Sequence, residues 1–406
     1  MGTQIGVGIS HHRNPRMAGK EAVMQANQQA ALSAEGDERP DLVMLFATVA
    51  YPQRVLLASV REATGQAPLI GCSSAGVIAP DVADESNFSV TVLVIKSDEM
   101  HFSHGHSIGL KADSAQVGQI IGEAIDTADA STEQPAQALF LFLDGMTPNF
   151  DAFMSGLRSV TPLEKSIPAI GGFAADHIAF RKTVQYCDDA VFSDGAVWAL
   201  LAGDVRVASV VSHGCVPLGA KHTVTKSDRN IVYEVDHQPV LEVLENYLMK
   251  SEIDDWGMAA VNLGWGFDRV DATADDDKII RCLISKDEET QSVHVFSEIP
   301  VGTEFWVTRR DLEKNYDKAD QMRDALMNAM GDDVPKLIFQ VECDGRGKVI
   351  FREQEKLALL KRLQHPMLSG RNADVPWIGL YAFAEIGPTC EQNYLHNFAS
   401  VLSAIY

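Results

Sequence analysis

The chain is poor in basic residues and in cysteine. Its 406 residues carry 34 Lys and Arg against 56 Asp and Glu, which gives a net charge of −22. An acidic chain without a basic cluster repels polyphosphates and anionic lipids, so the composition argues against nucleic acid and membrane surfaces as partners. The six cysteines never form a CxxC pair, which is typical of a reducing compartment.

Several sequence signals are absent. No stretch approaches the roughly 18–20 apolar residues that span a bilayer, and residues 1–16 lack the apolar segment of a secretory signal. The phosphate loop GxxxxGK[ST], a GxGxxG after a strand and the kinase signatures are also missing. We therefore expect a soluble cytoplasmic protein that binds no nucleotide and does not itself phosphorylate a partner.

Apolar runs of strand length alternate with amphipathic stretches of helix length. Residues 41–76 have the order buried strand, helix and apolar strand, 138–176 repeat that order, and 336–388 give a third, looser version. This alternation predicts an α/β fold of layered sheets and helices with internally duplicated β-α-β units. Because the period is about 100 residues rather than 20–50, it favours pseudo-symmetric halves over a solenoid.

Two motifs could carry chemistry but have a structural interpretation. GCSSAG at 71–76 does not match the GxSxG of a nucleophile elbow, and we interpret it as a small-residue strand end that lets two backbones approach closely. His101, His104 and His106 lie on a predicted strand. There His104 and His106 share a face and His101 lies opposite, which is poor geometry for three ligands to one metal and favours a solvated strand face.

Three other histidines follow strand-like runs closely, namely His177, His213 and His396. Ligand crevices of open α/β sheets form at the carboxyl ends of strands, so these residues are candidates for a binding site. A b-type haem needs one or two axial side chains and leaves no spacing signature. The sequence therefore leaves two roles open for each of these histidines, that of a haem ligand and that of an ordinary structural residue.

Six motifs follow one another in the order of a known family. They are PLIGCSSAGVI (68–78), IPAIGGFAAD (167–176), VVSHGCVPLGAKHTVT (210–225), VECDGRG (341–347), LYAFAEIGP (380–388) and LHNFA (395–399). On these motifs the chain resembles the FIST family of intracellular sensory proteins, with an N-terminal FIST region expected over 1–215 and a C-terminal FIST region over 216–406. The resemblance implies two FIST regions packed together in a ligand-sensing module for signal transduction, with amino acids among the small ligands proposed.

The chain is also similar to the NosP group, which are FIST proteins that bind b-type haem, sense nitric oxide and control a histidine kinase in trans. That resemblance implies haem b as cofactor, with iron held by His396 or His213 and with His177 as a further candidate ligand. His11 and His12 are less favoured candidates for the axial ligand. Whether the chain self-associates stays open.

The family motifs also carry candidate pocket residues, which are Cys215, Cys343, Arg346, Glu385 and Asn397. Arg346 and Glu385 could hold the two ends of an amino acid, Arg346 could face a haem propionate, or the two could form an internal ion pair. The sequence departs from the family at Ala384, where glycine is usual, and at Ala399, where threonine is usual.

Two functions are thus expected, a haem-based nitric-oxide sensor or a colourless sensor of an amino acid or similar metabolite. An enzyme using a reactive thiol such as Cys72 or Cys215 is the least supported function.

Overall fold

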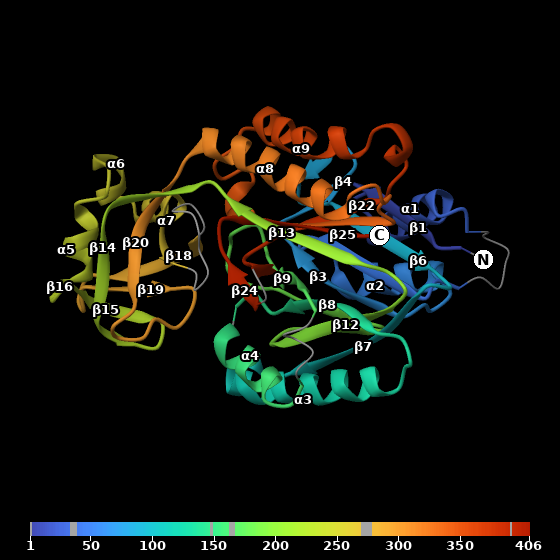
Figure 1. Ribbon diagram of the computed structural model, residues 1–406, viewed down its shortest axis with the longest axis horizontal. Coiled ribbons are helices and arrows are strands. Elements are labelled where there is room, and N and C mark those ends of the chain that lie inside the picture. The colour runs from blue at the N-terminus through green and yellow to red at the C-terminus, as the bar shows by residue number, and fades with distance from the viewer. Residues whose placement is uncertain (1, 33–38, 147–148, 162–166, 269–277, 390–391) are drawn as a thin grey trace. The chain divides into compact units, whose positions relative to one another are not determined.

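A computed structural model describes residues 2–32, 39–146, 149–161, 167–268, 278–389 and 392–406 (Figure 1). The chain divides into two compact units. Unit 1 comprises Met1–Ser212, Ala319–Tyr394 and Ser400–Tyr406, and unit 2 comprises His213–Lys318 and Leu395–Ala399. Unit 2 is thus formed by two segments that lie in the sequence between parts of unit 1.

Unit 1 contains three six-stranded sheets of the same construction. The first has the order β1 (Gln4–Ser10), β6 (Val90–Lys96), β2 (Leu42–Thr48), β3 (Leu69–Ser74), β10 (Gln185–Cys187) and β11 (Ala190–Phe192). The second has the order β7 (Met100–Ile108), β12 (Gly195–Gly203), β8 (Ala136–Leu143), β9 (Ala169–Phe173), β23 (Glu385–Thr389) and β24 (Gln392–His396). The third has the order β13 (Val207–His213), β25 (Ala399–Ile405), β21 (Leu337–Cys343), β22 (Trp377–Ala382), β4 (Gly76–Ala79) and β5 (Val82–Asp84).

Each sheet is built around one parallel pair of strands joined by a helix. The connecting helices are α2 (Gln53–Ala63) between β2 and β3, α4 (Phe150–Arg158) between β8 and β9, and α9 (Glu353–Met367) between β21 and β22. A second helix precedes each parallel pair, and these helices are α1 (Pro15–Gln29), α3 (Leu110–Ala130) and α8 (Leu312–Met330). The expected α/β fold with repeated β-α-β units is confirmed, but the repeats number three and not two. The looser third sequence pattern is a full structural repeat.

The last two strands of each sheet come from a different repeat. The strands β4 and β5 follow β3 but complete the third sheet, β10 and β11 follow β9 but complete the first, and β23 and β24 follow β22 but complete the second. Each repeat therefore contributes a pair of strands to the sheet of another repeat. The first repeat contributes to the third sheet, the second to the first and the third to the second. Such an exchange makes each sheet depend on two separate parts of the sequence.

A glycine occupies the same position in each repeat because the neighbouring strand leaves no room for a side chain. A Cβ atom would lie close to the carbonyl oxygen of the paired residue, at 2.0 Å for Gly71 on Leu45, 1.9 Å for Gly171 on Leu141 and 2.4 Å for Gly379 on Gln340. Real Cβ atoms essentially never come this near to a backbone atom. The close backbone approach that the small residues at 71–76 predict is confirmed.

Equivalent backbone hydrogen bonds join the three repeats in a closed ring just beyond the third strand of each. They run from Ala75 N to Tyr381 O at 3.0 Å, from Ala175 N to Ser73 O at 3.0 Å and from Phe383 N to Phe173 O at 3.1 Å. The donors and acceptors stand at matching positions of the three motifs. The ring therefore marks a pseudo-threefold axis at the carboxyl ends of the parallel strands.

The apolar core of unit 1 receives side chains from all three sheets. The rings of Phe46 and Phe142 lie 5.2 Å apart, and Phe339 lies 5.9 Å from Phe46, both in edge-to-face geometry. The helices α1 and α2 contact each other, as do α3 and α4. The other face of the first sheet packs against α1 and α2. This double covering explains why β2 is buried at every position.

Unit 2 is built on one seven-stranded sheet. Its order is β14 (Cys215–Asp228), β20 (Glu304–Arg310), β17 (Leu263–Asp268), β18 (Lys278–Asp287), β19 (Ser292–Val295), β15 (Ile231–Val235) and β16 (Gln238–Pro239). The strands β14 and β15 also pair, so the sheet turns back on itself. Its helices are α5 (Val240–Glu245), α6 (Lys250–Ile253) and α7 (Trp256–Asn262). Stacked rings of Trp265 and Phe305, 4.1 Å apart, lie in its core.

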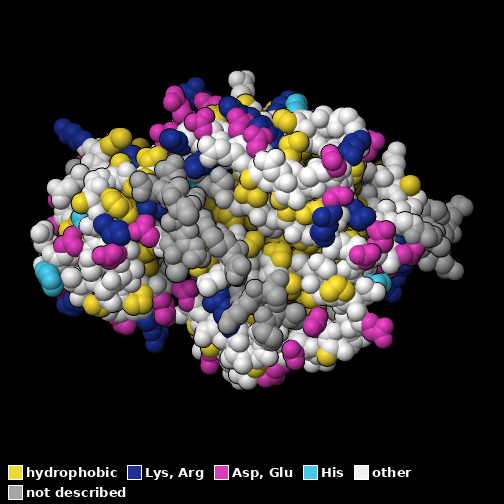
Figure 2. All heavy atoms as spheres, viewed as in Figure 1, with side chains coloured by type: hydrophobic (Ala, Val, Ile, Leu, Met, Phe, Trp, Pro, Cys, Tyr) yellow, Lys and Arg dark blue, Asp and Glu magenta, His cyan; other side chains and the backbone are white. Residues whose placement is uncertain are grey.

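No helix in the described part of the chain is both long and apolar enough to cross a bilayer. On the face shown in Figure 2, the described lysine and arginine side chains are interspersed with aspartate and glutamate rather than gathered into one basic patch.

Candidate functional site

The candidate residues from the sequence fall in both units. Unit 1 holds His177, Cys343, Arg346 and Glu385, all at or just beyond the carboxyl ends of its parallel strands. Unit 2 holds the other four, which are His213, Cys215, His396 and Asn397. Each group is described within its own unit.

Arg346 lies in a short 3-10 helix, Asp344–Arg346, and its side chain is almost fully buried. Its Nε donates to the Oε1 of Glu342, whose Oε2 accepts from Gln340 Nε2 at 2.9 Å. Burial lowers the pKa of Arg346, but the negative charge of Glu342, then Cys343 and Glu385, more than offsets this and raises the pKa. Arg346 is therefore a fixed cation with Glu342 as an ion-pair partner, and Glu385 acts on it through its charge.

A second buried ion pair lies in the same unit. Lys356 Nζ lies 2.9 Å from Glu85 Oε2, both side chains are 2% exposed, and Glu85 also accepts from Lys348 N at 2.8 Å. Lys356 Nζ is 5.9 Å from the centre of the Tyr381 ring. Burial, followed by the charges of Glu342 and Glu85, raises the pKa of Tyr381 well above its ordinary value. The phenol of Tyr381 therefore stays protonated near neutral pH, which makes it unsuited to transferring a proton there.

His177 stands in a loop that departs from ordinary backbone geometry. Its φ is +57°, and the carboxylate of Asp176 accepts three backbone N–H groups of this loop at 2.7–2.8 Å, from Phe180, Arg181 and Lys182. Within the described residues, neither ring nitrogen of His177 has a partner at hydrogen-bond distance and angle. The backbone of Ala75 still acts on the ring, and it favours a higher pKa of the imidazole.

The imidazole of His177 is held neutral. Burial, then the positive charge of Lys348, lowers the pKa of His177, while the charges of Asp176 and Asp84 oppose this. A neutral imidazole with two buried ring nitrogens can accept a metal or a hydrogen-bond donor.

His213, by contrast, uses both ring nitrogens inside unit 2. Its Nε2 lies 3.0 Å from Lys278 O, and its Nδ1 accepts from Cys215 N at 3.2 Å. The network thus assigns the proton to Nε2. A ligand at either nitrogen would have to replace one of these bonds.

Asn397 fastens the segment 395–399 to β18. Its Oδ1 accepts from Cys282 N at 3.1 Å and its N–H donates to Ile280 O at 3.2 Å. The preceding His396 is 3% exposed, and Cys215 is buried as well. Asn397 therefore has a clear structural role at this position.

A pocket of about 490 Å³ opens at the carboxyl end of β2, beside the N-terminus of α2, and we call it the Arg54 pocket. Its lining residues are Val49, Tyr51, Pro52, Gln53, Arg54, Lys182, Val184, Val191, Phe192 and Ser193. Among the described residues that line it, both charged side chains are cations and none is a carboxylate. No side chain caps α2, whose first residue follows Pro52. Two cations beside an uncapped helix N-terminus favour an anion.

The Arg54 pocket is linked to the ring at the pseudo-threefold axis. Val184 N donates to Ser73 Oγ at 3.1 Å, and Ser73 N donates to Val184 O at 2.8 Å. Ser73 is itself a member of the ring. At the N-terminus of α2, the hydroxyl of Tyr186 donates to Gln53 Oε1, and Gln53 Nε2 donates to Thr48 O at 3.0 Å.

Sequence reasoning missed this pocket. Arg54 and Lys182 belong to different repeats, and only the exchange of β10 and β11 into the first sheet brings them to one place. No spacing pattern in one repeat could have indicated the pair. The rule that ligands bind at the carboxyl ends of parallel strands points to this edge of the sheet but does not identify these residues.

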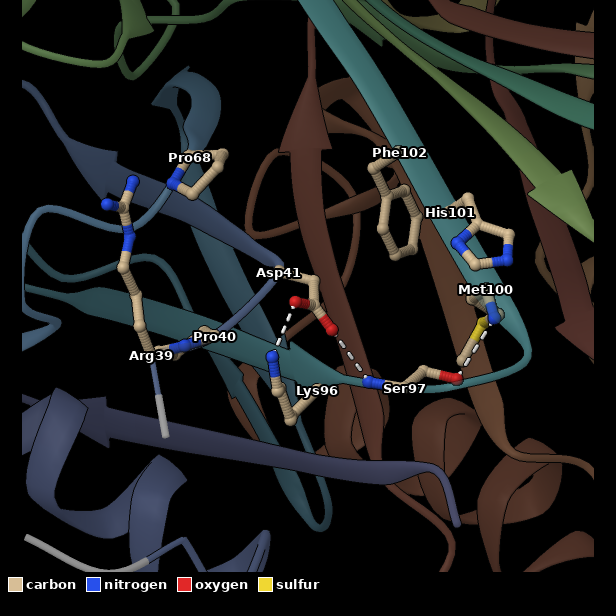
Figure 3. A pocket seen from close by; sticks show the side chains of 9 residues that line it. All are labelled: Arg39, Pro40, Asp41, Pro68, Lys96, Ser97, Met100, His101 and Phe102. Carbon is tan, nitrogen blue, oxygen red and sulfur yellow. Dashed lines mark hydrogen bonds and ion pairs between the residues drawn. The ribbon is translucent and has the colours of Figure 1, made fainter. Parts of the chain in front are cut away.

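A second pocket, of about 470 Å³, lies at the amino ends of β2 and β3 (Figure 3). Figure 3 shows the Asp41 carboxylate turned toward Lys96 Nζ, at 2.8 Å, and toward Ser97 N, at 2.9 Å. His101 and Phe102 line it from β7. Arg39 also lines this pocket, so after Asp41 has paired with Lys96 its lining has one cation in excess, whereas the lining of the Arg54 pocket has two.

Comparison with known proteins gives relatives that are described as uncharacterised, some of them matched over nearly their full length. The chain is 25% identical to the uncharacterised protein Mb0898c of Mycobacterium bovis, over 98% of both chains. It is 26% identical to the uncharacterised protein Rv0628c of Mycobacterium tuberculosis, over 98% of this chain and 99% of the relative. It is 30% identical to the uncharacterised protein MJ1623 of Methanocaldococcus jannaschii, over 44% of this chain and 35% of the relative.

Among solved structures, a chorismatase matches with a TM-score of 0.37 and 11% identity, over 100% of this chain and 99% of that one. A cyanuric acid hydrolase matches with a TM-score of 0.26 and 12% identity, over 50% of this chain and 71% of that one.

Family models cover most of the chain. The FIST N domain matches residues 41–238 and the FIST C domain matches residues 241–388. FIST domains are generally sensory, non-enzymatic domains of signal-transduction proteins. The chain belongs to the FIST family.

Proposed function

We propose that this chain senses a small anionic metabolite, which binds in the Arg54 pocket, and that it reports binding to a partner protein. The observation that carries the proposal is the lining of this pocket. It contains Arg54 and Lys182 and no carboxylate, in a chain whose net charge is −22. A site that gathers cations against such a background favours a negatively charged ligand.

The pocket chemistry also indicates the ligand class. A guanidinium pairs with a carboxylate or phosphate through two parallel hydrogen bonds, and a lysine ammonium adds a point charge. The remaining walls include apolar side chains, such as Val184, Val191 and Phe192. Amino acids, other small carboxylates and phosphate esters with an apolar part all meet this description.

Binding could reach the rest of unit 1 through the segment that contributes Lys182. Lys182 N donates to Asp176 Oδ2 at 2.8 Å, and Val184 is bonded to Ser73 of the ring. A ligand that pairs with Lys182 in only one arrangement of this segment would favour that arrangement. The segment therefore offers a path from the pocket to the junction of the three repeats.

Thermal unfolding in the presence of a ligand panel tests the proposal. The panel contains amino acids, dicarboxylates and sugar phosphates, each compared with an uncharged analogue. We expect at least one anion, and not its neutral analogue, to raise the melting temperature, because a ligand that binds only the folded state stabilises it. The double variant Arg54→Gln/Lys182→Gln should lose this rise.

The matched control is Arg181→Gln/Lys20→Gln, which removes the same charge at exposed positions outside the pocket lining. A rise that the control abolishes as completely as the pocket variant would show that net charge, and not the pocket, determines binding. Such a result would refute the proposal.

A haem-based nitric-oxide sensor is a second candidate, and the observation that favours it is the neutral, half-buried ring of His177. A haem bound there would supply the iron that binds nitric oxide, and His177 would hold it. His213 fits less well because both its ring nitrogens are engaged. His396 stays a candidate from the family motif. Of the charged groups that act on His177, Lys348 suits a haem propionate, whereas the carboxylates of Asp176 and Asp84 would repel one.

An absorption spectrum of protein produced with haem supply separates the two candidates. A Soret band that shifts on addition of nitric oxide to the reduced protein, and that His177→Ala removes while His396→Ala and His213→Ala retain it, would support the second candidate. A spectrum without a Soret band after haem titration would contradict the haem sensor and leave the anionic metabolite as the proposed ligand.

The receiving partner that we propose is a histidine kinase in the cytoplasm, because FIST domains serve signal transduction and this sequence carries no kinase signature. The test is the autophosphorylation rate of histidine kinases from the same organism, measured with and without this protein and with and without its ligand. A rate that changes only when the ligand is present would support the pairing, and an unchanged rate would contradict it.

A further inference from the structure

Three side chains of metal-ligating type meet in unit 1, away from the Arg54 pocket lining. They are His104 of β7, Cys187 at the end of β10, and Asp188. Their ligand atoms all lie within 4.8 Å of one another, and His104 Nε2 is 3.0 Å from Asp188 Oδ2. The sequence did not suggest this group, because the residues come from strands far apart in the chain.

The fold holds these groups in place from two sheets. Asp188 follows β10 with a φ of +48°, its N–H donates to Leu69 O at 2.8 Å, and its Oδ1 accepts from Leu69 N at 3.1 Å. The carboxylate is therefore fixed to the first sheet with Oδ2 turned toward His104. On the second sheet, His104 and His106 lie on the same face of β7, as strand periodicity predicts. Both contact the hairpin of β10 and β11, since His104 reaches Asp188 and the ring of His106 stacks on that of Phe192 with 4.6 Å between their centres.

We propose that His104, Cys187 and Asp188 bind a zinc ion. An imidazole, a thiolate and a carboxylate are all ordinary zinc ligands, with bond lengths of about 2.0–2.3 Å. Two ligand atoms on one tetrahedral zinc ion stand a little over 3 Å apart at such bond lengths, and the His104–Asp188 separation of 3.0 Å is close to this. A thiolate and a carboxylate would balance the two charges of the ion.

Access and charge both allow an ion to reach the group. The side chains of His104 and Asp188 are 19% and 43% exposed, so a water molecule can complete the coordination from the solvent side. A cation also lies close by among the described residues, since Arg61 Nη1 is 3.8 Å from Asp188 Oδ1. Arg61 is itself paired with Asp189 at 2.9 Å, which reduces its repulsion of a metal ion.

Metal binding should depend on pH. A cysteine binds zinc as the thiolate, so the Cys187 thiol must lose its proton when the metal binds. His104 is the group facing Asp188 from the other strand. Zinc would displace the thiol proton, so binding releases a proton and strengthens as the pH rises.

A bound ion would connect the edges of two sheets. The hairpin of β10 and β11 completes the first sheet, and β7 is the edge strand of the second. Because the unfolded chain lacks this arrangement, zinc should raise the melting temperature of the protein.

Titration of the metal-free protein with Co²⁺ and then with Zn²⁺ tests the proposal. We expect one equivalent of Co²⁺ to produce a thiolate-to-cobalt charge-transfer band in the near ultraviolet, and Zn²⁺ to displace it. The variants Cys187→Ala, His104→Ala and Asp188→Asn should each weaken Zn²⁺ binding by at least about tenfold, and Cys187→Ala should also remove the band.

The control His101→Ala removes an exposed histidine of the same strand, and Cys282→Ala removes a half-buried thiol of unit 2. Both should leave the band and the affinity unchanged. Two results would overturn the proposal, whether or not the ligand variants fold. One is the absence of a charge-transfer band in the wild-type protein, and the other is a band that Cys282→Ala removes.

Discussion

The amide of Ala75 donates to the carbonyl oxygen of Tyr381 at 3.0 Å, and this bond joins the first repeat of unit 1 to the third. The equivalent bonds from Ala175 and Phe383 complete a ring that none of the repeats could form alone. Together with the exchanged strand pairs, the ring makes the three repeats one structural unit. Residues at the carboxyl ends of all three parallel pairs consequently meet around one axis.

Replacing Gly71 by alanine should severely destabilise unit 1. Its φ is +152°, and the added methyl group would lie 2.0 Å from Leu45 O. We expect a loss of at least about 3 kcal/mol in the free energy of unfolding, from backbone strain together with the clash. The control is Gly65→Ala, which also has a positive φ, of +61°, but meets nothing within 4 Å, and should cost about 1 kcal/mol. Equal losses in a denaturant titration would contradict the close-approach argument.

Removing one member of the buried pair Arg346–Glu342 should cost more than removing both. Arg346→Met leaves Glu342 as an uncompensated buried charge, and we expect a loss of about 3–5 kcal/mol in unfolding free energy. The double variant Glu342→Gln/Arg346→Met should recover part of that loss. Arg362→Met, in a more exposed ion pair with Asp320, should cost under about 1 kcal/mol. A double variant less stable than Arg346→Met would show that the pair is not the dominant interaction of these residues.

Glu252 should make unit 2 sensitive to acid. Its carboxylate is 1% exposed and accepts from Arg309 at 2.8 and 2.9 Å, and this interaction lowers the pKa of Glu252 to about 2. A lowered pKa stabilises the fold above the unfolded pKa of about 4.5, and the contribution disappears as the pH falls toward 2. The shift corresponds to about 3 kcal/mol.

The measurement compares the unfolding free energies of wild type and Glu252→Gln between pH 7 and pH 3. The deficit of the variant should shrink steadily below about pH 4.5. Glu304→Gln, at an exposed position, should show no such trend. A deficit of Glu252→Gln that stays constant with pH would mean that the carboxylate is not ionised in the folded protein.

Local sequence patterns predicted the repeated β-α-β units because buried parallel strands are continuous apolar runs. The run Leu42–Thr48 is an example, as all seven of its residues are buried. The small residues around Gly71 likewise indicated a close backbone approach. Both signals arise from neighbouring residues, so they survive in one sequence without any alignment.

The exchange of strand pairs between repeats has no local signature. It brings Arg54 beside Lys182, and His104 beside Cys187, although nothing in the spacing of either pair predicts the contact. One of the two partners of His213 is similarly distant in the sequence, since Lys278 O belongs to another strand of unit 2. The sequence therefore predicted that His177 follows a strand closely, as it does, while the pocket itself required the three-dimensional arrangement.

The most direct test of the proposed sensing function is calorimetric titration of the anion that stabilises the protein most. For the wild-type protein we expect one equivalent of ligand per chain, with an affinity that falls as salt is added because charge pairing contributes to binding. Arg54→Gln/Lys182→Gln should bind at least about a hundredfold more weakly, since two charge-assisted contacts are lost. Unchanged affinity in that variant would contradict the account and remove the Arg54 pocket as the ligand site.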